Sequence, residues 1–265
     1  MSSQIKAIIK YHLRANIKNK SLYFCFFSVL IFVFSVFVLY LHSNQSYINN
    51  MIISITNLKG GVGKSTISQN LAVVLAHKDY KVCILDTDME QRSSMKWHGL
   101  REVKPDIPVF GVESEQINKV ADEQNRQYDI VIIDGSPQLS KTATKTLMAA
   151  DLVLVPITPS SLDVWSFENF LERYEQVKDV KGDNIQAYIL LNRYTGNTKL
   201  DKEVMDVMGE FDIRLMQTTI GQRVAYREAP TNGLGVIETR DQKAKDEIMR
   251  FAEEVESILT AMAQN

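Results

Sequence analysis

The apolar residues of this chain fall into short unbroken runs that alternate with longer amphipathic stretches. Runs in which nearly every residue is apolar are typical of parallel strands that are covered on both faces. Such runs, together with two shorter ones, predict strands at residues 51–56, 81–86, 109–112, 128–134, 151–156, 185–191 and 213–217.

Between these runs the apolar residues recur at the spacing of one helix face, as at Ile67, Leu71, Val74 and Leu75. The same pattern predicts helices at residues 65–77, 95–101, 113–125, 139–149, 162–177, 200–210 and 241–262. Strands that alternate with helices in this way predict an α/β fold, a doubly wound and mostly parallel sheet flanked by helices.

The segment at residues 57–66, NLKGGVGKST, lies between the first predicted strand and the first predicted helix. Its glycines allow a tight turn whose N–H groups can surround a phosphate. The general phosphate-loop pattern G-x-x-x-x-G-K-[ST] needs a glycine where Leu58 stands, so the match is to the deviant form with Lys59 at the entrance. We expect Lys64 to reach the β- and γ-phosphates of ATP and Ser65 to ligate Mg²⁺.

Aspartates stand at or just after the carboxyl ends of two buried strands. Asp86 and Asp88 belong to the first of these ends, and Asp134 ends the strand at residues 128–134. Ligands of open α/β sheets bind beyond these ends, so the carboxylates should face the phosphate loop. We expect Asp134 to hold Mg²⁺ through water, with Asp86 as a second candidate metal ligand.

Net charge and cysteine content narrow the range of functions. Residues 1–50 carry five basic and no acidic residues, which leaves 25 basic and 32 acidic residues in the remainder. Any contact with nucleic acid in residues 51–265 must therefore come from a local basic patch. Cys25 and Cys83 have no metal-site spacing, which fits a reducing compartment.

The first fifty residues differ from the rest of the chain. Residues 23–41 are 19 residues without a charge, enough to cross a bilayer as a helix. All five basic residues precede them, so the positive-inside rule would export the nucleotide-binding part away from ATP. We therefore expect two parts, a basic leader at 1–50 with this transmembrane-like segment and an ATPase domain at 51–265. We favour Met51 as the physiological start over an anchor of unusual topology or a cleaved signal peptide.

Several motifs give the chain a resemblance to a known family. They are KGGVGKST at 59–66, LDTDMEQ at 85–91, VIIDGSP at 131–137, VPITPSSLD at 155–163, LLNR at 190–193 and QRVAYREAPTNGLGVIE at 222–238. With these, residues 51–265 resemble the deviant Walker-A ATPases, and among them the ParA-type partition proteins of the small plasmid subtype.

The resemblance implies a role for each matching residue. Lys59 would contact the nucleotide of the other protomer in an ATP-bound dimer, and Asp88 would orient the attacking water. With Lys64, these are the implied catalytic residues. The implied nucleotide-binding residues are Gly60, Gly61, Val62, Gly63, Lys64, Ser65, Thr66 at the α-phosphate and Asn192 at the adenine. The family usually has proline directly after the aspartate that matches Asp88. Here Met89 and Glu90 stand between Asp88 and Gln91, so Gln91 is given no role.

The resemblance also implies a function and partners. Such ATPases dimerise on ATP, bind DNA non-specifically and hydrolyse ATP when a centromere-binding partner stimulates them, in the cytoplasm on the nucleoid. Phosphate-directed DNA contacts would come from basic residues near the C-terminal end of the domain. The candidates are Arg223, favoured among them, Arg227, Arg240 and Lys243, with Lys245 and Arg250 set among acidic residues.

Other functions remain open at this point. A MinD-like membrane-associated positioning ATPase would need a basic amphipathic helix at the C-terminus, whereas residues 246–265 are acidic. A membrane-anchored tyrosine-kinase-like ATPase would carry a C-terminal tyrosine cluster, but the last tyrosine is Tyr226. An iron–sulfur electron carrier would need paired cluster cysteines. A nucleotide-free structural module would leave Lys64, Asp88 and Asp134 without a purpose.

Overall fold

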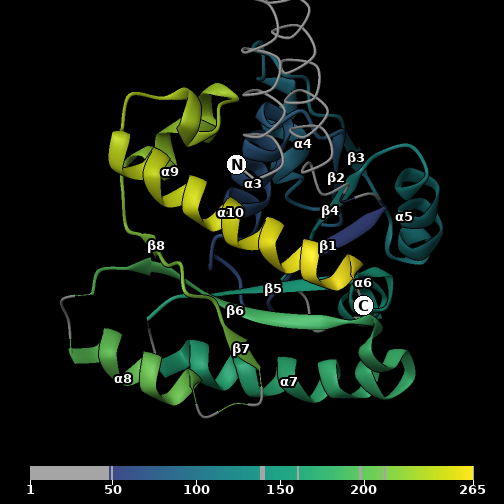
Figure 1. The fold of residues 1–265 in the computed structure, drawn as a ribbon, viewed down its shortest axis with the longest axis vertical. Coiled ribbons are helices and arrows are strands. Elements are labelled where there is room, and N and C mark those ends of the chain that lie inside the picture. The colour runs from purple at the N-terminus through teal and green to yellow at the C-terminus, as the bar shows by residue number, and fades with distance from the viewer. Residues whose placement is uncertain are drawn as a thin grey trace, which may run out of the picture. The chain divides into compact units, whose positions relative to one another are not determined.

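The apolar runs become the strands of a parallel sheet in the computed structural model (Figure 1). The structure describes residues 48, 50–137, 141–159, 161–196, 199–209, 211 and 213–264, of which 48–264 belong to one compact unit. The hydrogen-bonded order is β3-β2-β4-β1-β5-β6-β7, with β8 paired to β6, and every described pair is parallel. The strands are β1 (Met51–Ile55), β2 (Val82–Asp86), β3 (Val109–Gly111), β4 (Ile130–Asp134), β5 (Leu152–Ile157), β6 (Gln186–Tyr194), β7 (Arg214–Leu215) and β8 (Ile220–Gly221).

The predicted helices are also present, with ends that differ by a few residues. They are α3 (Lys64–His77), α4 (Ser93–Gly99), α5 (Ile117–Asn125), α6 (Lys141–Ala149), α7 (Ser161–Lys181), α8 (Lys199–Met208) and α10 (Gln242–Ala263). A further short helix, α9 (Ala225–Glu228), and four 3₁₀ turns complete the described elements, at Ser114–Gln116, Gly182–Asn184, Ala229–Asn232 and Val236–Glu238.

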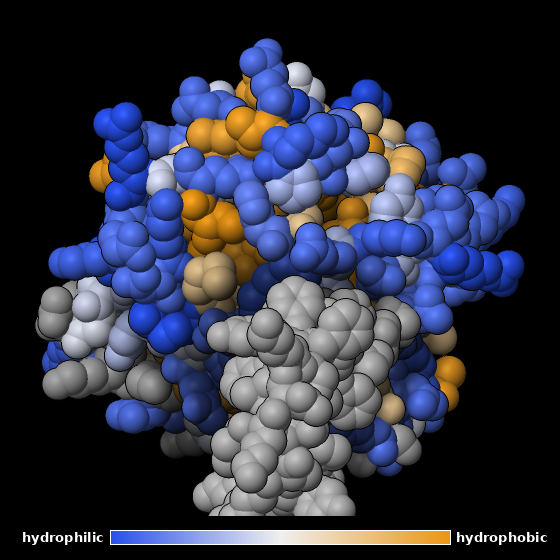
Figure 2. Space-filling view, turned by 45° about the horizontal axis from the view of Figure 1, so that its top comes forward, coloured by the Kyte–Doolittle hydropathy of each residue, from blue (hydrophilic) through white to orange (hydrophobic). Residues whose placement is uncertain are grey.

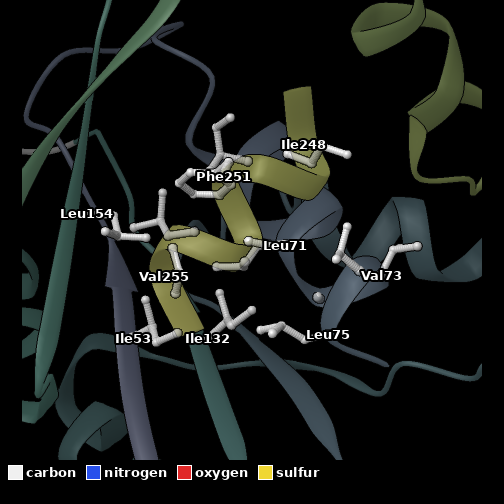
Figure 3. Close-up of a cluster of buried hydrophobic side chains, with 14 of the residues drawn as sticks. Ile53, Leu71, Val73, Leu75, Ile132, Leu154, Ile248, Phe251 and Val255 are labelled. Carbon is white, nitrogen blue, oxygen red and sulfur yellow. The ribbon is translucent and has the colours of Figure 1, made fainter. Parts of the chain in front are cut away.

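Alternate residues of each central strand point to opposite faces of the sheet, and helices pack against both faces. Ile53 and Ile55 of β1 belong to a core with α3, α4 and α10, whereas Ile52 packs on the other side with α5. A third cluster joins β5 and β6 to α6, α7 and α8. Figure 3 shows the first core, where Phe251 and Val255 of α10 meet Leu71 of α3 above the sheet. The doubly wound α/β fold predicted from the sequence is confirmed.

The largest departure from the expected elements lies between residues 186 and 240. Strand β6 runs on through Asn192 to Tyr194, instead of ending at residue 191, because Ile220 pairs with Asn192 and Gly221 with Tyr194. The two-residue β8, α9 and the 3₁₀ turns that follow have no periodic pattern of their own. Their conformation depends on partners far away in the sequence.

Hydrophilic residues cover most of the face drawn in Figure 2, and the hydrophobic ones form small separate patches. No helix in the described part of the chain is long and apolar enough to span a bilayer. The predicted transmembrane-like segment at residues 23–41 lies outside the described residues. The division into a leader and an ATPase domain therefore stays a prediction.

Candidate nucleotide-binding site

The glycine-rich loop joins the carboxyl end of β1 to the start of α3. Gly61 and Gly63 have φ values of 74° and 97°, a left-handed region that glycine enters at little cost. A Cβ atom on Gly63 would lie 2.3 Å from Nδ2 of Asn192, so this position also needs the absence of a side chain. The loop backbone thus has a shape that favours glycine at both positions, and at Gly63 a side chain would also displace the Asn192 amide.

Polar contacts brace the loop from inside the protein. Asn57 donates from Nδ2 to the Pro156 carbonyl at 2.8 Å, and its Oδ1 accepts the Lys59 N–H at 2.9 Å. Helix α3 then begins at Lys64 with no acidic residue in its first turn. The unpaired N–H groups and dipole of a helix start favour a bound anion, so loop and helix together form a suitable phosphate site.

Lys64 is the cation of this site and is almost completely buried, with 6% of its surface exposed. Its Nζ donates to the Lys59 carbonyl at 2.8 Å, which folds the side chain back over the loop. Burial lowers the pKa of Lys64 to about 8, although the negative charges of Asp134 and Asp88 oppose this change. The predicted lysine and two of the predicted aspartates are therefore brought together.

Asp134, at the end of β4, is buried among hydroxyl groups. Ser94 donates to its Oδ2 at 2.7 Å and Ser68 to its Oδ1 at 3.4 Å, and Ser65 is hydrogen-bonded to the same carboxylate. Burial raises the pKa of Asp134 to about 7, and the neighbouring Asp86 carboxylate adds to the rise.

These contacts also test the predicted magnesium site. A hydroxyl oxygen and a carboxylate side by side, as in Ser65 and Asp134, are oxygen donors of the kind that Mg²⁺ binds together with phosphates. Because Ser65 and Asp134 supply only two such donors, they fit an ion that is shared with the phosphates of a nucleotide. The described residues contain no group of three His, Cys, Asp or Glu residues that could hold a metal ion.

Asp86 has a structural task that the sequence did not reveal. Its Oδ2 accepts the N–H groups of Ser94 and Met95 at 2.9 and 3.0 Å, and its Oδ1 accepts that of Asp88 at 3.2 Å. The carboxylate thereby holds the first turn of α4. A role for Asp86 as a metal ligand stays a prediction.

Asp88 is only partly buried, and Gln91 donates its N–H to Oδ1 at 3.0 Å. This bond closes the short turn that carries Met89 and Glu90. Asp88 lies near enough to Lys64 for its negative charge to raise the pKa of the lysine. Its role in orienting the attacking water stays a prediction.

Asn192 is buried under the loop, where its Nδ2 donates to the Val62 carbonyl at 2.7 Å. Two residues further along β6, Tyr194 contributes to a cavity of about 350 Å³, together with Thr195, Gly196, Thr219, Gly221, Gln222, Arg223 and Glu247. The structure thus places Asn192 as a support of the phosphate loop. Its role at the adenine stays a prediction, as does that of Thr66 at the α-phosphate.

Three hydroxyl residues of the site were not predicted from the sequence. Ser94 and Ser68 contact Asp134, and Thr87 donates from Oγ1 to the Asp134 carbonyl at 2.8 Å. Thr87 stands between Asp86 and Asp88, so its position in the sequence could have indicated that it belongs to the site. Ser68 and Ser94 gave no such indication, because only the packing of α3 and α4 brings them to the end of β4.

The four candidate DNA contacts fall into two groups. Arg227, Arg240 and Lys243 are exposed. Arg223, the favoured candidate, instead donates from Nη2 to Oε1 of Glu247 at 2.5 Å, and its side chain is only 30% exposed. One nitrogen of its guanidinium is therefore paired within the protein.

Comparisons with known proteins agree with this geometry. Residues 53–236, more than half of the chain, match the family described as the CobQ/CobB/MinD/ParA nucleotide binding domain. The chain belongs to this family. As a MinD/ParA-type domain it is a nucleotide-binding ATPase, and the predicted family is confirmed.

Individual relatives of this MinD/ParA domain include proteins named for different processes. The maintenance of carboxysome distribution protein A of Halothiobacillus neapolitanus is 28% identical over 210 residues, 77% of this chain and 95% of that protein. The sporulation initiation inhibitor protein Soj of Bacillus subtilis is 26% identical over 230 residues, 70% of this chain and 90% of that protein. The solved structure of the septum site-determining protein MinD of Pyrococcus horikoshii, complexed with Mg-ADP, has a TM-score of 0.64 at 20% identity, covering 78% of this chain and 96% of that one.

Proposed function

We propose that this chain is a ParA-type partition ATPase that binds ATP and Mg²⁺ at the loop of residues 59–66. The observation that carries the proposal is the convergence of Lys64, Asp88 and Asp134 at one edge of the sheet, next to a helix start. Phosphoryl transfer needs positioning and neutralisation of charge more than covalent chemistry, and these groups supply both.

Each residue has a task in this proposal. Lys64 turns from the Lys59 carbonyl to the β- and γ-phosphates, and Asn192 lies at the adenine. Ser65 and Asp134 hold the metal ion, which when bound neutralises phosphate charge. Asp88 orients the attacking water.

Lys59 makes hydrolysis depend on a second copy of the chain. It stands at the loop entrance, partly buried, where the resemblance assigns contact with the partner protomer's nucleotide. ATP would then act as the signal for dimerisation. DNA would be bound non-specifically by Arg227, Arg240 and Lys243, and a centromere-binding protein would stimulate turnover on the nucleoid.

Two variants test the site. Lys64→Ala should abolish binding of ATP, and Asp88→Ala should bind ATP and dimerise without turnover, while the exposed neighbour Glu90→Ala should behave as the wild type. Calorimetry, analytical ultracentrifugation and phosphate release measure the three steps. Unchanged ATP affinity in Lys64→Ala would contradict the site, and normal hydrolysis by Asp88→Ala would contradict its role.

DNA binding needs a separate test. The ATP-bound protein should bind a non-specific duplex with an affinity that falls steeply as salt rises, because phosphate contacts release counterions. Replacing Arg227, Arg240 and Lys243 by alanine should flatten this dependence, whereas absence of binding at low salt would remove the partition function.

Positioning of a protein cargo is the second candidate function. It is favoured by the carboxysome distribution protein, of which the match covers 95%. A small basic DNA-binding protein encoded immediately downstream would favour partition instead. A MinD-like membrane cycle is less well supported, since the apolar side of α10 is buried against α3 and the sheet.

A further inference from the structure

The cavity at the end of β6 has its second wall in the segment around β8. One wall comes from Tyr194, the last residue of β6, with Thr195 and Gly196, and the other from Gly221, the last residue of β8, with Gln222 and Arg223. The pairing of Tyr194 with Gly221 brings the two walls together. What holds the second wall in place therefore determines the shape of the cavity.

Glu247 of α10 holds this wall. It is a buried carboxylate, 8% exposed, that lines the cavity. Its Oε2 accepts the Gly221 N–H at 3.2 Å, its Oε1 accepts Arg223 Nη2 at 2.5 Å, and Tyr226 is hydrogen-bonded to the same group. Hydrogen bonds that involve a charged group are about twice as strong as neutral ones, so one side chain fixes both the backbone and the guanidinium of the wall.

A second glutamate on α10 provides a natural comparison. Glu254 lies seven residues, or about two turns, after Glu247 on the same side of the helix. Its oxygens accept the N–H groups of Gln217 and Thr218 at 2.7 and 2.8 Å. Both glutamates therefore attach the segment around β8 to α10, which contacts β8, but among these two only Glu247 lines the cavity.

Arg223 is the cationic donor of the cavity wall, and its side chain is 30% exposed. Its Nε is enclosed by protein and is not the atom that a ligand in the cavity would reach. The guanidinium carries five N–H donors, and the bond to Glu247 uses Nη2. The ring nitrogens of a purine are acceptors for such donors.

We propose that Glu247 is a positioning residue for the base of the bound nucleotide. It holds Gly221 and the Arg223 guanidinium where they contact a purine, so that affinity for the base depends on α10 as well as on the phosphate loop. This inference rests on the proposed binding of ATP, and it assigns to Arg223 a contact with the nucleotide in place of DNA.

The test separates the base from the phosphates. Calorimetry on the full chain compares MgATP with magnesium tripolyphosphate, which has no base. Glu247→Gln keeps the size of the side chain but removes its charge, and it should weaken ATP about tenfold while tripolyphosphate binds as before. Arg223→Met should show the same selective loss. Glu254→Gln, which loosens the same segment away from the cavity, should leave the ratio of the two affinities unchanged.

The outcomes distinguish this inference from the function it rests on. Wild-type protein that binds neither ligand would overturn the proposed function itself. If the wild type binds both but Glu247→Gln loses them equally, or loses neither, only the role of Glu247 is overturned. Urea unfolding of each variant shows that the compared proteins are folded. If Glu254→Gln changed the ratio of ATP affinity to tripolyphosphate affinity as much as Glu247→Gln does, the assignment would also be refuted.

Discussion

Replacing Asp134 by asparagine should change how the stability of the nucleotide-free protein depends on pH. The carboxyl is completely buried, and its pKa is raised from 3.8 to about 7. The folded protein therefore keeps the proton up to about pH 7, whereas the unfolded chain releases it near pH 4. The contribution of Asp134 to wild-type stability must then fall as pH rises through this range, because ionising the buried group costs free energy.

The size of the effect follows from the two pKa values. A rise from 3.8 to about 7 corresponds to about 4 kcal/mol at pH values above 7. Asparagine keeps the shape and an acceptor for the Ser94 hydroxyl but cannot ionise. Asp134→Asn should therefore equal the wild type near pH 4 and exceed its free energy of unfolding by up to about 4 kcal/mol at pH 8.

Urea unfolding between pH 4 and pH 8 in EDTA, followed by tryptophan fluorescence, measures this difference. Asp206→Asn, an exposed aspartate on α8, controls for the general effect of removing one negative charge. A difference between Asp134→Asn and wild type that stays constant with pH, or is largest in acid, would refute the reasoning. The same variant should bind MgATP more weakly, so stability and function move in opposite directions.

Two further predictions concern the glycines of the loop and the buried ion pair of Arg101 with Glu238. Gly63→Ala should lower the free energy of unfolding by more than the 1–2 kcal/mol of backbone strain, and weaken ATP binding in calorimetry, because its φ is 97° and its Cβ has no room. Gly61→Ala, with φ 74° and nothing within 4 Å, should show the strain alone, and equal losses would contradict this reading. Arg101→Met should cost about 3 kcal/mol in urea unfolding because it leaves the carboxylate of Glu238, which is 10% exposed, without its buried cation. Removal of the exposed Lys199 from its ion pair should cost less than about 1 kcal/mol, and a similar loss in both variants would count against the buried pair.

The sequence was sufficient for the features whose information is local. Strands β1, β2, β4 and β5 were predicted because a strand buried on both faces needs an unbroken apolar run, and α3 and α10 because their apolar residues repeat at helical spacing. The phosphate loop was recognised because its backbone requires glycine where φ is positive. The lysine and the aspartates next to it followed from the rule that strand ends meet at one edge.

Only the tertiary structure decided which partners the polar side chains take. Asp86 attaches to the backbone of α4, Asn192 supports the loop at Val62, and Arg223 bonds to Glu247. The partners of Asp86, Asn192 and Arg223 are 8, 130 and 24 residues away in the sequence. These contacts form because packing of the chain brings buried donors and acceptors close together. A residue's type limits the bonds it can form, but the fold around it determines which of them are made.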